Sequence, residues 1–398
     1  MTKYNLKIKQ GSDEYISPWK ISKVIDDLAG EYYKKYLLNI ITDRVANLNE
    51  NEHLVIFNES FDMYNKYAKL KNFSIRKKED ILDIYYLGNP ISLKPSLRIM
   101  KMSLIFEMHR KLFTKLNSIK VMMDRDKMYE YINPNLNDNK EFNLDSLEKY
   151  LIERLSSTEK DNIKIKNDCD NIVAGFKKKL SDYVRCIDDF EIINDFKDEK
   201  ELVTYLDKFK KQNIYKDYYE VFEDNFNKLG RPIVGIVDIE KGTLEVLAKD
   251  FIKEDLQNEN ENKFEMVDLS KNSPTAMAFI VGVIVLPWLV SLFVTNLETK
   301  KIKQKKEITK TEVQTNPELL KLEEVIEAFK DLRDGINDIG EKVVSLEDYK
   351  VQKTINKMND NINTKTLETL NRHDFLNENI ELKRIDAPKE DMKQEDNE

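Results

Sequence analysis

One uncharged stretch, residues 272–297, limits the possible folds of this chain more than any other feature. It reads NSPTAMAFIVGVIVLPWLVSLFVTNL, in a protein that is 35% Asp, Glu, Lys and Arg. About 20 apolar residues, each adding 1.5 Å of helix, cross a hydrocarbon core of roughly 30 Å. We therefore predict a single transmembrane helix over 272–297. Its candidate membrane residues are Ala276, Phe279, Gly282, Pro287, Trp288 and Phe293.

The glycine and the proline in this stretch leave its path open. Proline can kink a membrane helix, and it also permits a re-entrant or pore-lining arrangement with both flanks on one side. A helix buried in the core of a large soluble domain is a further alternative. Such a helix does not need twenty-six uncharged residues, so we favour the kinked single span.

The flanks of the stretch give conflicting indications of its orientation. Five lysines follow the stretch, and positively charged flanks usually stay in the cytoplasm. The same lysines are candidate contacts for anionic lipid headgroups: Lys300, Lys301, Lys303, Lys305 and Lys306. The N-terminus MTKYNLKIKQ, however, has no apolar core like that of a secretory signal. Cys169 and Cys186 lie about 25 Å apart on one predicted helix, too far for a disulfide. We therefore expect a single-pass cell-membrane protein whose N-terminal domain is cytoplasmic.

Hydrophobic periodicity predicts a mixed α/β domain over residues 1–130. Alternation from Tyr4 to Ile8 indicates a half-buried strand, and helical spacing follows Ser17-Pro18 as far as about Asn47. We further expect a buried strand at 53–57, two strands around the Gly88-Asn89-Pro90 turn within 81–93, and a buried helix at 97–116.

Residues 131–232 are expected to form a helical insertion, and residues 233–271 a β-hairpin that completes the domain. Asp145 and Glu148 form a capping box at the start of the first helix. The hairpin is predicted from two β-branched runs that flank Lys241-Gly242. The predicted fold class is therefore α+β, with one transmembrane helix and a helical C-terminal region.

The C-terminal region carries the clearest periodic signal in the chain. After a basic linker at 298–318, apolar residues recur at alternating spacings of three and four, which is typical of a coiled coil. The predicted oligomer seam is Leu322, Val325, Phe329, Leu332, Ile336, Ile339, Val343 and Leu346. Gly335 and Gly340 weaken this helix by about 1 kcal/mol each, so it needs a partner: another copy, or the weaker pattern at 351–362. The coiled-coil region spans 319–385, and we expect the tail 386–398 to be disordered.

No motif for catalysis, cofactor binding or metal binding stands out. His53, His109 and His373 are scattered and have no second histidine at ligand spacing. Residues 61–120 hold thirteen basic and five acidic residues, a local excess of eight positive charges. A solvated face of the fold explains this excess better than a nucleic-acid-binding surface does, because no recognisable nucleic-acid-binding module is present. Asp238, Glu240 and Lys241 share only their residue types with the active sites of some metal-dependent nucleases, and their spacing does not match. Their position at a predicted hairpin turn, where polar residues are common, explains them better.

These observations predict a membrane-anchored, non-enzymatic sensor or effector. Its α/β domain would bind an unknown small ligand or protein, and its homo-oligomerisation would couple that event to the bilayer. Toxic or defence effectors of bacteria share this layout, which is an analogy of architecture only. Two alternatives stay open: a passive tether that recruits a partner through the coiled coil, and a hydrolase or nuclease with a dispersed site. No specific nucleic-acid partner is expected.

Overall fold

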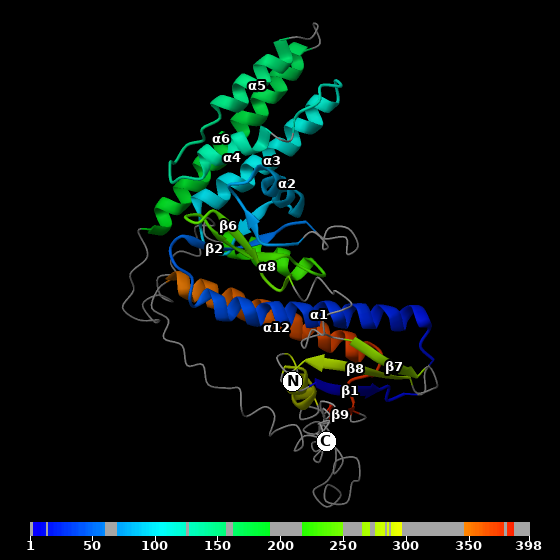
Figure 1. The fold of residues 1–398 in the computed structure, drawn as a ribbon. Coiled ribbons are helices and arrows are strands. Elements are labelled where there is room, and N and C mark those ends of the chain that lie inside the picture. The colour runs from blue at the N-terminus through cyan, green and yellow to red at the C-terminus, as the bar shows by residue number, and fades with distance from the viewer. Residues whose placement is uncertain are drawn as a thin grey trace, which may run out of the picture. The chain divides into compact units, whose positions relative to one another are not determined.

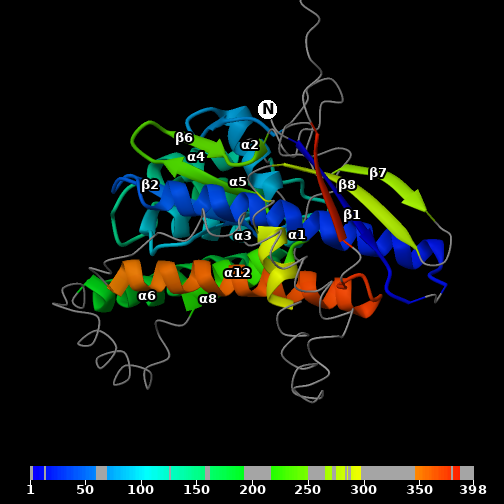
Figure 2. The same cartoon turned by 90° about the horizontal axis from the view of Figure 1, so that it is seen from below.

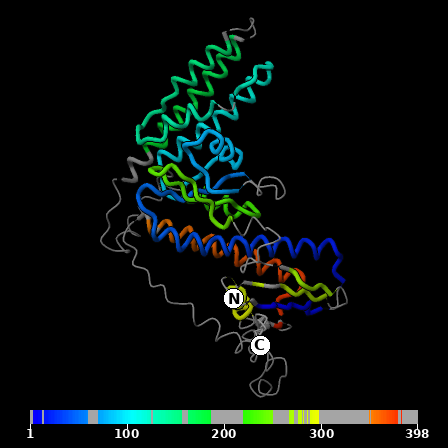
Figure 3. Tube along the Cα trace, in the orientation of Figure 1, coloured from blue at the N-terminus to red at the C-terminus, as the bar shows by residue number. Residues whose placement is uncertain are grey.

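The computed structural model describes most of the chain as two compact units (Figures 1 and 3). The described residues are 3–12, 15–59, 70–124, 127–156, 162–191, 217–249, 265–270, 275–282, 285, 288–296, 346–377 and 380–385. Unit 1 comprises residues 1–36, 250–340 and 360–398, and unit 2 comprises 37–249 and 341–359. The division falls within two long helices, α1 (Pro18–Val45) and α12 (Leu346–Arg372).

Unit 1 is built on a four-stranded antiparallel sheet in the order β7-β8-β1-β9. Its strands are β1 (Lys3–Lys9), β7 (Glu265–Ser270), β8 (Ala276–Gly282) and β9 (Ile380–Ile385). The predicted N-terminal strand is thus confirmed as β1. It pairs with β8 on one side and with β9 on the other, so segments far apart in sequence form one sheet, as Figure 2 shows for β1, β7 and β8.

An apolar core joins this sheet to helices of the same unit. Leu28 and Tyr32 of α1 are buried, together with strand residues such as Leu6 and Phe279. The helix at 288–296 adds Phe293, also buried. The predicted helix after Ser17-Pro18 is confirmed as α1, because its apolar positions recur at helical spacing over the full 28 residues.

The predicted transmembrane helix over 272–297 is wrong in its secondary structure. Residues 276–282 form β8, a central strand paired on both edges, and Phe279 is 1% exposed. A continuous apolar run fits a strand buried on both faces as well as it fits a membrane helix, and the pattern alone does not separate them. The helix at 288–296 is about 14 Å long at 1.5 Å per residue, half of a hydrocarbon core of roughly 30 Å.

In the part of the chain that the structure describes, no helix is both long enough and apolar enough to cross a membrane.

Unit 2 contains a five-stranded antiparallel sheet in the order β3-β6-β5-β2-β4. The strands are β2 (Glu52–Phe57), β3 (Phe73–Ser74), β4 (Pro90–Ser92), β5 (Val234–Asp238) and β6 (Thr243–Val246). The predicted hairpin is confirmed as β5–β6, and its turn places Gly242 at φ 69°, a conformation that favours glycine. All five residues of β5 are buried, so both faces of the sheet are covered.

Helices surround this sheet. They are α2 (Lys78–Leu87), α3 (Leu97–Asn117), α4 (Met128–Ile132) with the 3-10 turn η3 (Asn133–Asn135), α5 (Asp145–Ser156), α6 (Asn162–Glu191) and α8 (Asp217–Lys228). Helix α3 packs against α6 and β4, and α8 packs against β2 and β4. The helices predicted at 97–116 and within 145–230 are therefore confirmed where the structure describes them.

The pair of strands predicted within 81–93 is half wrong. Residues 78–87 form α2, and only the part after the Gly88-Asn89-Pro90 turn is a strand, β4. Ile81, Ile84 and Tyr85 are buried at spacings of three and one, which is one helix face. Glu79 and Asp80 in the first turn also favour a helix, through the helix dipole.

Because β8 is buried, we expect a substitution in this strand to destabilise the fold. Phe279→Ala should lower the free energy of unfolding by about 3–5 kcal/mol, because it opens a cavity beneath a fully buried aromatic ring. Met266→Ala on the neighbouring β7 is the control, since Met266 is 40% exposed, and it should cost about 0.5 kcal/mol or less. Urea unfolding of the full chain measures both values. Equal effects of the two substitutions would contradict the placement of β8.

Candidate ligand-binding cleft

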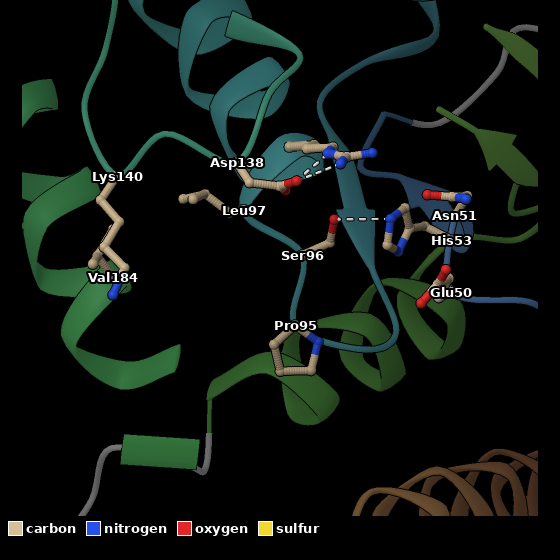
Figure 4. Close-up of a pocket in the computed structure, with 10 residues that line it drawn as sticks. Glu50, Asn51, His53, Pro95, Ser96, Leu97, Asp138, Lys140 and Val184 are labelled. Atoms are coloured by element: carbon tan, nitrogen blue, oxygen red, sulfur yellow. Dashed lines mark hydrogen bonds and ion pairs between the residues drawn. The ribbon is translucent and has the colours of Figure 1, made fainter. Parts of the chain in front are cut away.

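Unit 2 holds a cleft of about 590 Å³ at the N-terminal end of α3 (Figure 4). Residues from five segments line it: the turn before β2, β2 itself, the start of α3, the loop after η3, and α6. They are Glu50, Asn51, His53, Pro95, Ser96, Leu97, Arg98, Asp138, Lys140 and Val184. We call this group the α3 cleft.

Ser96 caps α3 and is fixed from two directions. Its hydroxyl oxygen accepts a hydrogen bond from the N–H of Ile99 at 3.5 Å, the usual role of a serine at a helix N-cap. The hydroxyl of Tyr183, on α6, accepts from the Ser96 N–H at 2.9 Å and donates to the Ser96 carbonyl at 3.2 Å. The start of α3 is therefore held in place by α6.

Leu97 and Arg98, whose N–H groups belong to the first turn of α3, are among the residues that line the cleft. Helix geometry gives these N–H groups no intrahelical acceptor, and the described residues supply no other one. Such groups, together with the partial positive charge of the helix N-terminus, attract anions.

His53 enters the cleft from β2, beside the cap residue. Its Nε2 lies 3.3 Å from the Ser96 hydroxyl, as the dashed line in Figure 4 shows. Burial first, and then the positive charge of Arg98, lower the pKa of His53 to about 4. The ring is therefore neutral at pH 7. The Ser96 hydroxyl, whose oxygen already accepts from Ile99, can donate its proton to Nε2.

Arg98 and Asp138, which also line the cleft, form a two-point ion pair. The guanidinium Nε donates to Asp138 Oδ1 at 2.8 Å, and Nη2 donates to Oδ2. This hydrogen bond raises the pKa of Arg98 and lowers that of Asp138. The Asp138 side chain is 70% exposed and the Arg98 side chain 23% exposed, so the pair lies at the solvent-facing rim. At such exposure it contributes little to stability.

Buried amides hold the loop that carries Asp138. Asn135, 1% exposed, donates to the carbonyls of Tyr131 and Asn143 at 2.6 and 2.7 Å. The fully buried Lys101 of α3 donates to the carbonyl and side-chain oxygens of Asn137 at 3.3 and 3.1 Å. Burial lowers the pKa of Lys101, while the negative charge of Asp138 and the two Asn137 acceptors favour its ammonium form. The cleft is thus supported by a closed set of polar contacts.

The candidate membrane residues lie partly in the interior of unit 1. Ala276, Phe279, Trp288 and Phe293 are buried, and the Trp288 indole donates to Asn363 Oδ1 at 2.6 Å. Gly282 ends β8, while Pro287 lies outside the described residues.

The other two candidate sets fall almost wholly outside the described residues. The five candidate headgroup lysines and the seam positions from Leu322 to Val343 lie outside the described residues. The last seam position, Leu346, is described and is the first residue of α12. The weaker pattern in α12 is described: Val351, Ile355, Met358 and Ile362 are all buried.

The remaining polar candidates have structural roles. Asp238 Oδ1 accepts from the Lys241 N–H at 2.8 Å, and its other oxygen meets the Lys241 ammonium at 2.8 Å, so the pair closes the β5–β6 turn. Arg76 of the basic region donates to the Glu240 carbonyl. His109 is buried edge-on to Tyr85, with ring centroids 5.6 Å apart. Within the described ranges, no group of three His, Cys, Asp or Glu side chains is placed to hold a metal ion.

The sequence carries two signals for this cleft. Ser96 stands directly before the helix predicted at 97–116, at the N-cap position that serine favours. The run NPNLNDN at 133–139 is typical of a loop built from Asx turns, and Asn137 Oδ1 indeed accepts from the Asn139 N–H at 3.1 Å. Neither signal says that the two segments meet.

The depressed pKa of His53 predicts an acid-sensitive contribution to stability. Between pH 6.5 and about 4, His53 takes up a proton in the unfolded chain but not in the folded one, so folding weakens as pH falls through this range. The ring protons should titrate by NMR with a midpoint near 4. Urea unfolding of His53→Gln should lose less stability between pH 7 and pH 5 than the unsubstituted chain does. An equal loss would contradict the buried, neutral ring.

The chain matches no protein-family model, and neither the curated proteins nor the solved structures gave a significant match.

Proposed function

We propose that this protein binds a small ligand that carries a carboxylate or phosphate group, and that the α3 cleft holds this group. The observation that carries this function is that Leu97 and Arg98 line the cleft and that their first-turn N–H groups have no acceptor among the described residues. Backbone donors at a helix N-terminus are a preferred site for such anions.

The side chains around these donors support an anionic group with a polar remainder. Arg98 uses Nε and Nη2 on Asp138, which leaves other guanidinium N–H groups for a ligand. Lys140 adds a second positive charge, and Glu50 and Asp138 balance the formal charge of the lining. The neutral His53 and Asn51 can each donate or accept a hydrogen bond.

Ligand binding in unit 2 agrees with the sensor predicted from the sequence, and our proposal keeps that part. Coupling to self-association through the coiled-coil region predicted at 319–385 stays part of the same proposal. Residues 319–345 lie outside the described residues, and residues 380–385 form the strand β9 rather than a helix. A transmembrane anchor at 276–282 is not carried forward, because these residues form β8.

Two substitutions on opposite sides of the ion pair should change anion affinity in opposite directions. Arg98→Gln should weaken the binding of inorganic phosphate about tenfold or more, since a hydrogen bond to a charged group contributes about 1.5–3 kcal/mol. Asp138→Asn should strengthen it, because it removes a carboxylate that competes for Arg98. Isothermal titration calorimetry measures both values.

The matched control is Arg154→Gln, since Arg154 is exposed on α5 and does not line the cleft. It should leave phosphate affinity unchanged. The absence of phosphate and acetate binding in the unsubstituted chain, or equal losses in the two arginine variants, would contradict the proposal.

The contact between Ser96 and His53 favours a second candidate, a serine hydrolase. In this reaction the Ser96 hydroxyl oxygen would attack an acyl carbonyl while its proton passes to His53 Nε2. The N–H groups of Leu97 and Arg98 would stabilise the oxyanion, and His53 would return the proton to the leaving group before water releases the acyl chain. A pKa of about 4 makes His53 a weak base, which places this candidate second.

A fluorophosphonate probe tests the hydrolase candidate. It should label the peptide that contains Ser96, as read by mass spectrometry, and His53→Gln should slow the labelling by about 100-fold or more, the usual contribution of a general base. Ser96→Asn removes the nucleophile but keeps a good N-cap residue, and it should abolish the label. Absence of label on Ser96 in the folded, unsubstituted chain would exclude the hydrolase candidate. It would not bear on the proposal that the α3 cleft binds an anionic ligand.

A further inference from the structure

One carboxylate in the α3 cleft has no partner among the described residues. Asp138 is paired with Arg98, whereas the Glu50 side chain is exposed and meets no donor or cation in the described part of the chain. Glu50 stands in the turn before β2 and lines the cleft. The cleft therefore offers a negative charge that the protein itself does not neutralise.

Asn51 adds a second acceptor beside this carboxylate. Its side-chain Nδ2 donates to Glu240 Oε2 at 3.1 Å, which sets the orientation of the amide. Asn51 Oδ1 is then left as an acceptor, and the described residues supply no donor for it. The Asn51 backbone is fixed as well, since its N–H donates to Asn49 Oδ1 at 2.9 Å and its carbonyl accepts from the Ile239 N–H at 3.1 Å. We call Glu50 and Asn51 Oδ1 the acceptor end of the cleft.

Two lysines lie near the acceptor end without neutralising it. The Lys241 ammonium is already paired with Asp238 Oδ2 at 2.8 Å. Lys94 is close to His53, because its charge contributes, after burial and the charge of Arg98, to the low pKa of that ring. Within the described ranges, neither lysine forms an ion pair with the free carboxylate.

The acceptor end and the start of α3 are within reach of one small molecule. His53 lies three residues after Glu50, and its Nε2 is 3.3 Å from the Ser96 hydroxyl at the cap of α3. Three residues of extended chain span at most about 11 Å. Figure 4 shows Glu50, Asn51 and His53 together on one side of Ser96. At about 590 Å³, the cleft has room for more than an anionic group alone.

We propose that the ligand of the α3 cleft is zwitterionic: its anionic group lies at the first turn of α3, and an ammonium group at the other end of a short chain lies at Glu50 and Asn51 Oδ1. This inference rests on the proposed function, because it needs an anion at the start of α3. An ammonium group has three donors and no acceptor, which matches the oxygens of the acceptor end. Amino acids and aminoalkyl phosphates both have this chemistry.

A neutral hydroxyl group fits the acceptor end less well. It donates one hydrogen bond and leaves the charge of Glu50 uncompensated, whereas an ammonium group supplies donors to both oxygens together with a positive charge. The charged side chains of the lining are Arg98, Lys140, Glu50 and Asp138, two of each sign. A zwitterion therefore also keeps the filled cleft near electrical neutrality.

Matched pairs of ligands test for the ammonium group by isothermal titration calorimetry on the full chain. γ-Aminobutyrate should bind about two- to fivefold more tightly than butyrate, the contribution of an ion pair at an exposed carboxylate. γ-Hydroxybutyrate should bind about as tightly as butyrate. Aminoethyl phosphate against ethyl phosphate repeats the comparison, and the pair with the larger gain identifies the class of ligand. The gain should shrink at high salt concentration.

A substitution at Glu50 tests where the ammonium group lies. Glu50→Gln should abolish the gain and leave the affinity for butyrate unchanged or slightly higher, because it removes only the negative charge of an exposed side chain. Glu220→Gln is the matched control, since Glu220 is exposed on α8 and does not line the cleft. It should keep the gain.

The outcomes separate this inference from the proposed function. Binding of butyrate or ethyl phosphate with no gain for either amino compound would overturn the inference and leave the anion site standing. An equal gain for γ-hydroxybutyrate, or a gain that survives in Glu50→Gln, would do the same. If none of these compounds binds, the anion site and the inference both fail.

Discussion

Unit 1 depends on the pairing of β8 with β1. These strands come from opposite parts of the chain, since Lys3 is opposite Gly282 and Lys9 is opposite Ala276. The register places Leu6 across from Phe279, both of them buried, so the pairing and the apolar core support each other. Strand β9 adds to the other edge of β1, and the sheet thereby ties residues 3–9 to residues 380–385. Residues 276–282, the first part of the most apolar stretch of the sequence, thus form an inner strand of this sheet.

The α3 cleft depends in turn on polar groups that are buried and satisfied. Tyr183 fixes the start of α3 from α6, and Lys101 and Asn135 fix the loop that carries Asp138. Buried hydrogen bonds of this kind cost stability when one partner is lost, so they hold a specific geometry. The N–H groups of Leu97 and Arg98, which have no acceptor among the described residues, lie beside this network at the first turn of α3. A rigid frame around unsatisfied donors is what ligand binding requires.

The sequence predicted local structure where periodicity and capping agreed. Helices α1, α3, α5 and α6 and the β5–β6 hairpin follow from apolar spacing and from glycine or capping residues. It failed where one pattern fits two structures: the apolar run 276–282 is a strand, and the run after Lys78 is a helix. The sequence pattern did not predict the strand order or the cleft, because His53, Ser96 and Asp138 meet only through tertiary packing. No local pattern encodes that meeting.

Amide NMR of the full chain in inorganic phosphate tests whether the first turn of α3 binds an anion. We expect the N–H resonances of Leu97 and Arg98 to shift most and to saturate together. They should do so at phosphate concentrations that leave the amides of α5 unchanged. Saturable shifts confined to other segments, or no saturable shift at the start of α3, would contradict anion binding there.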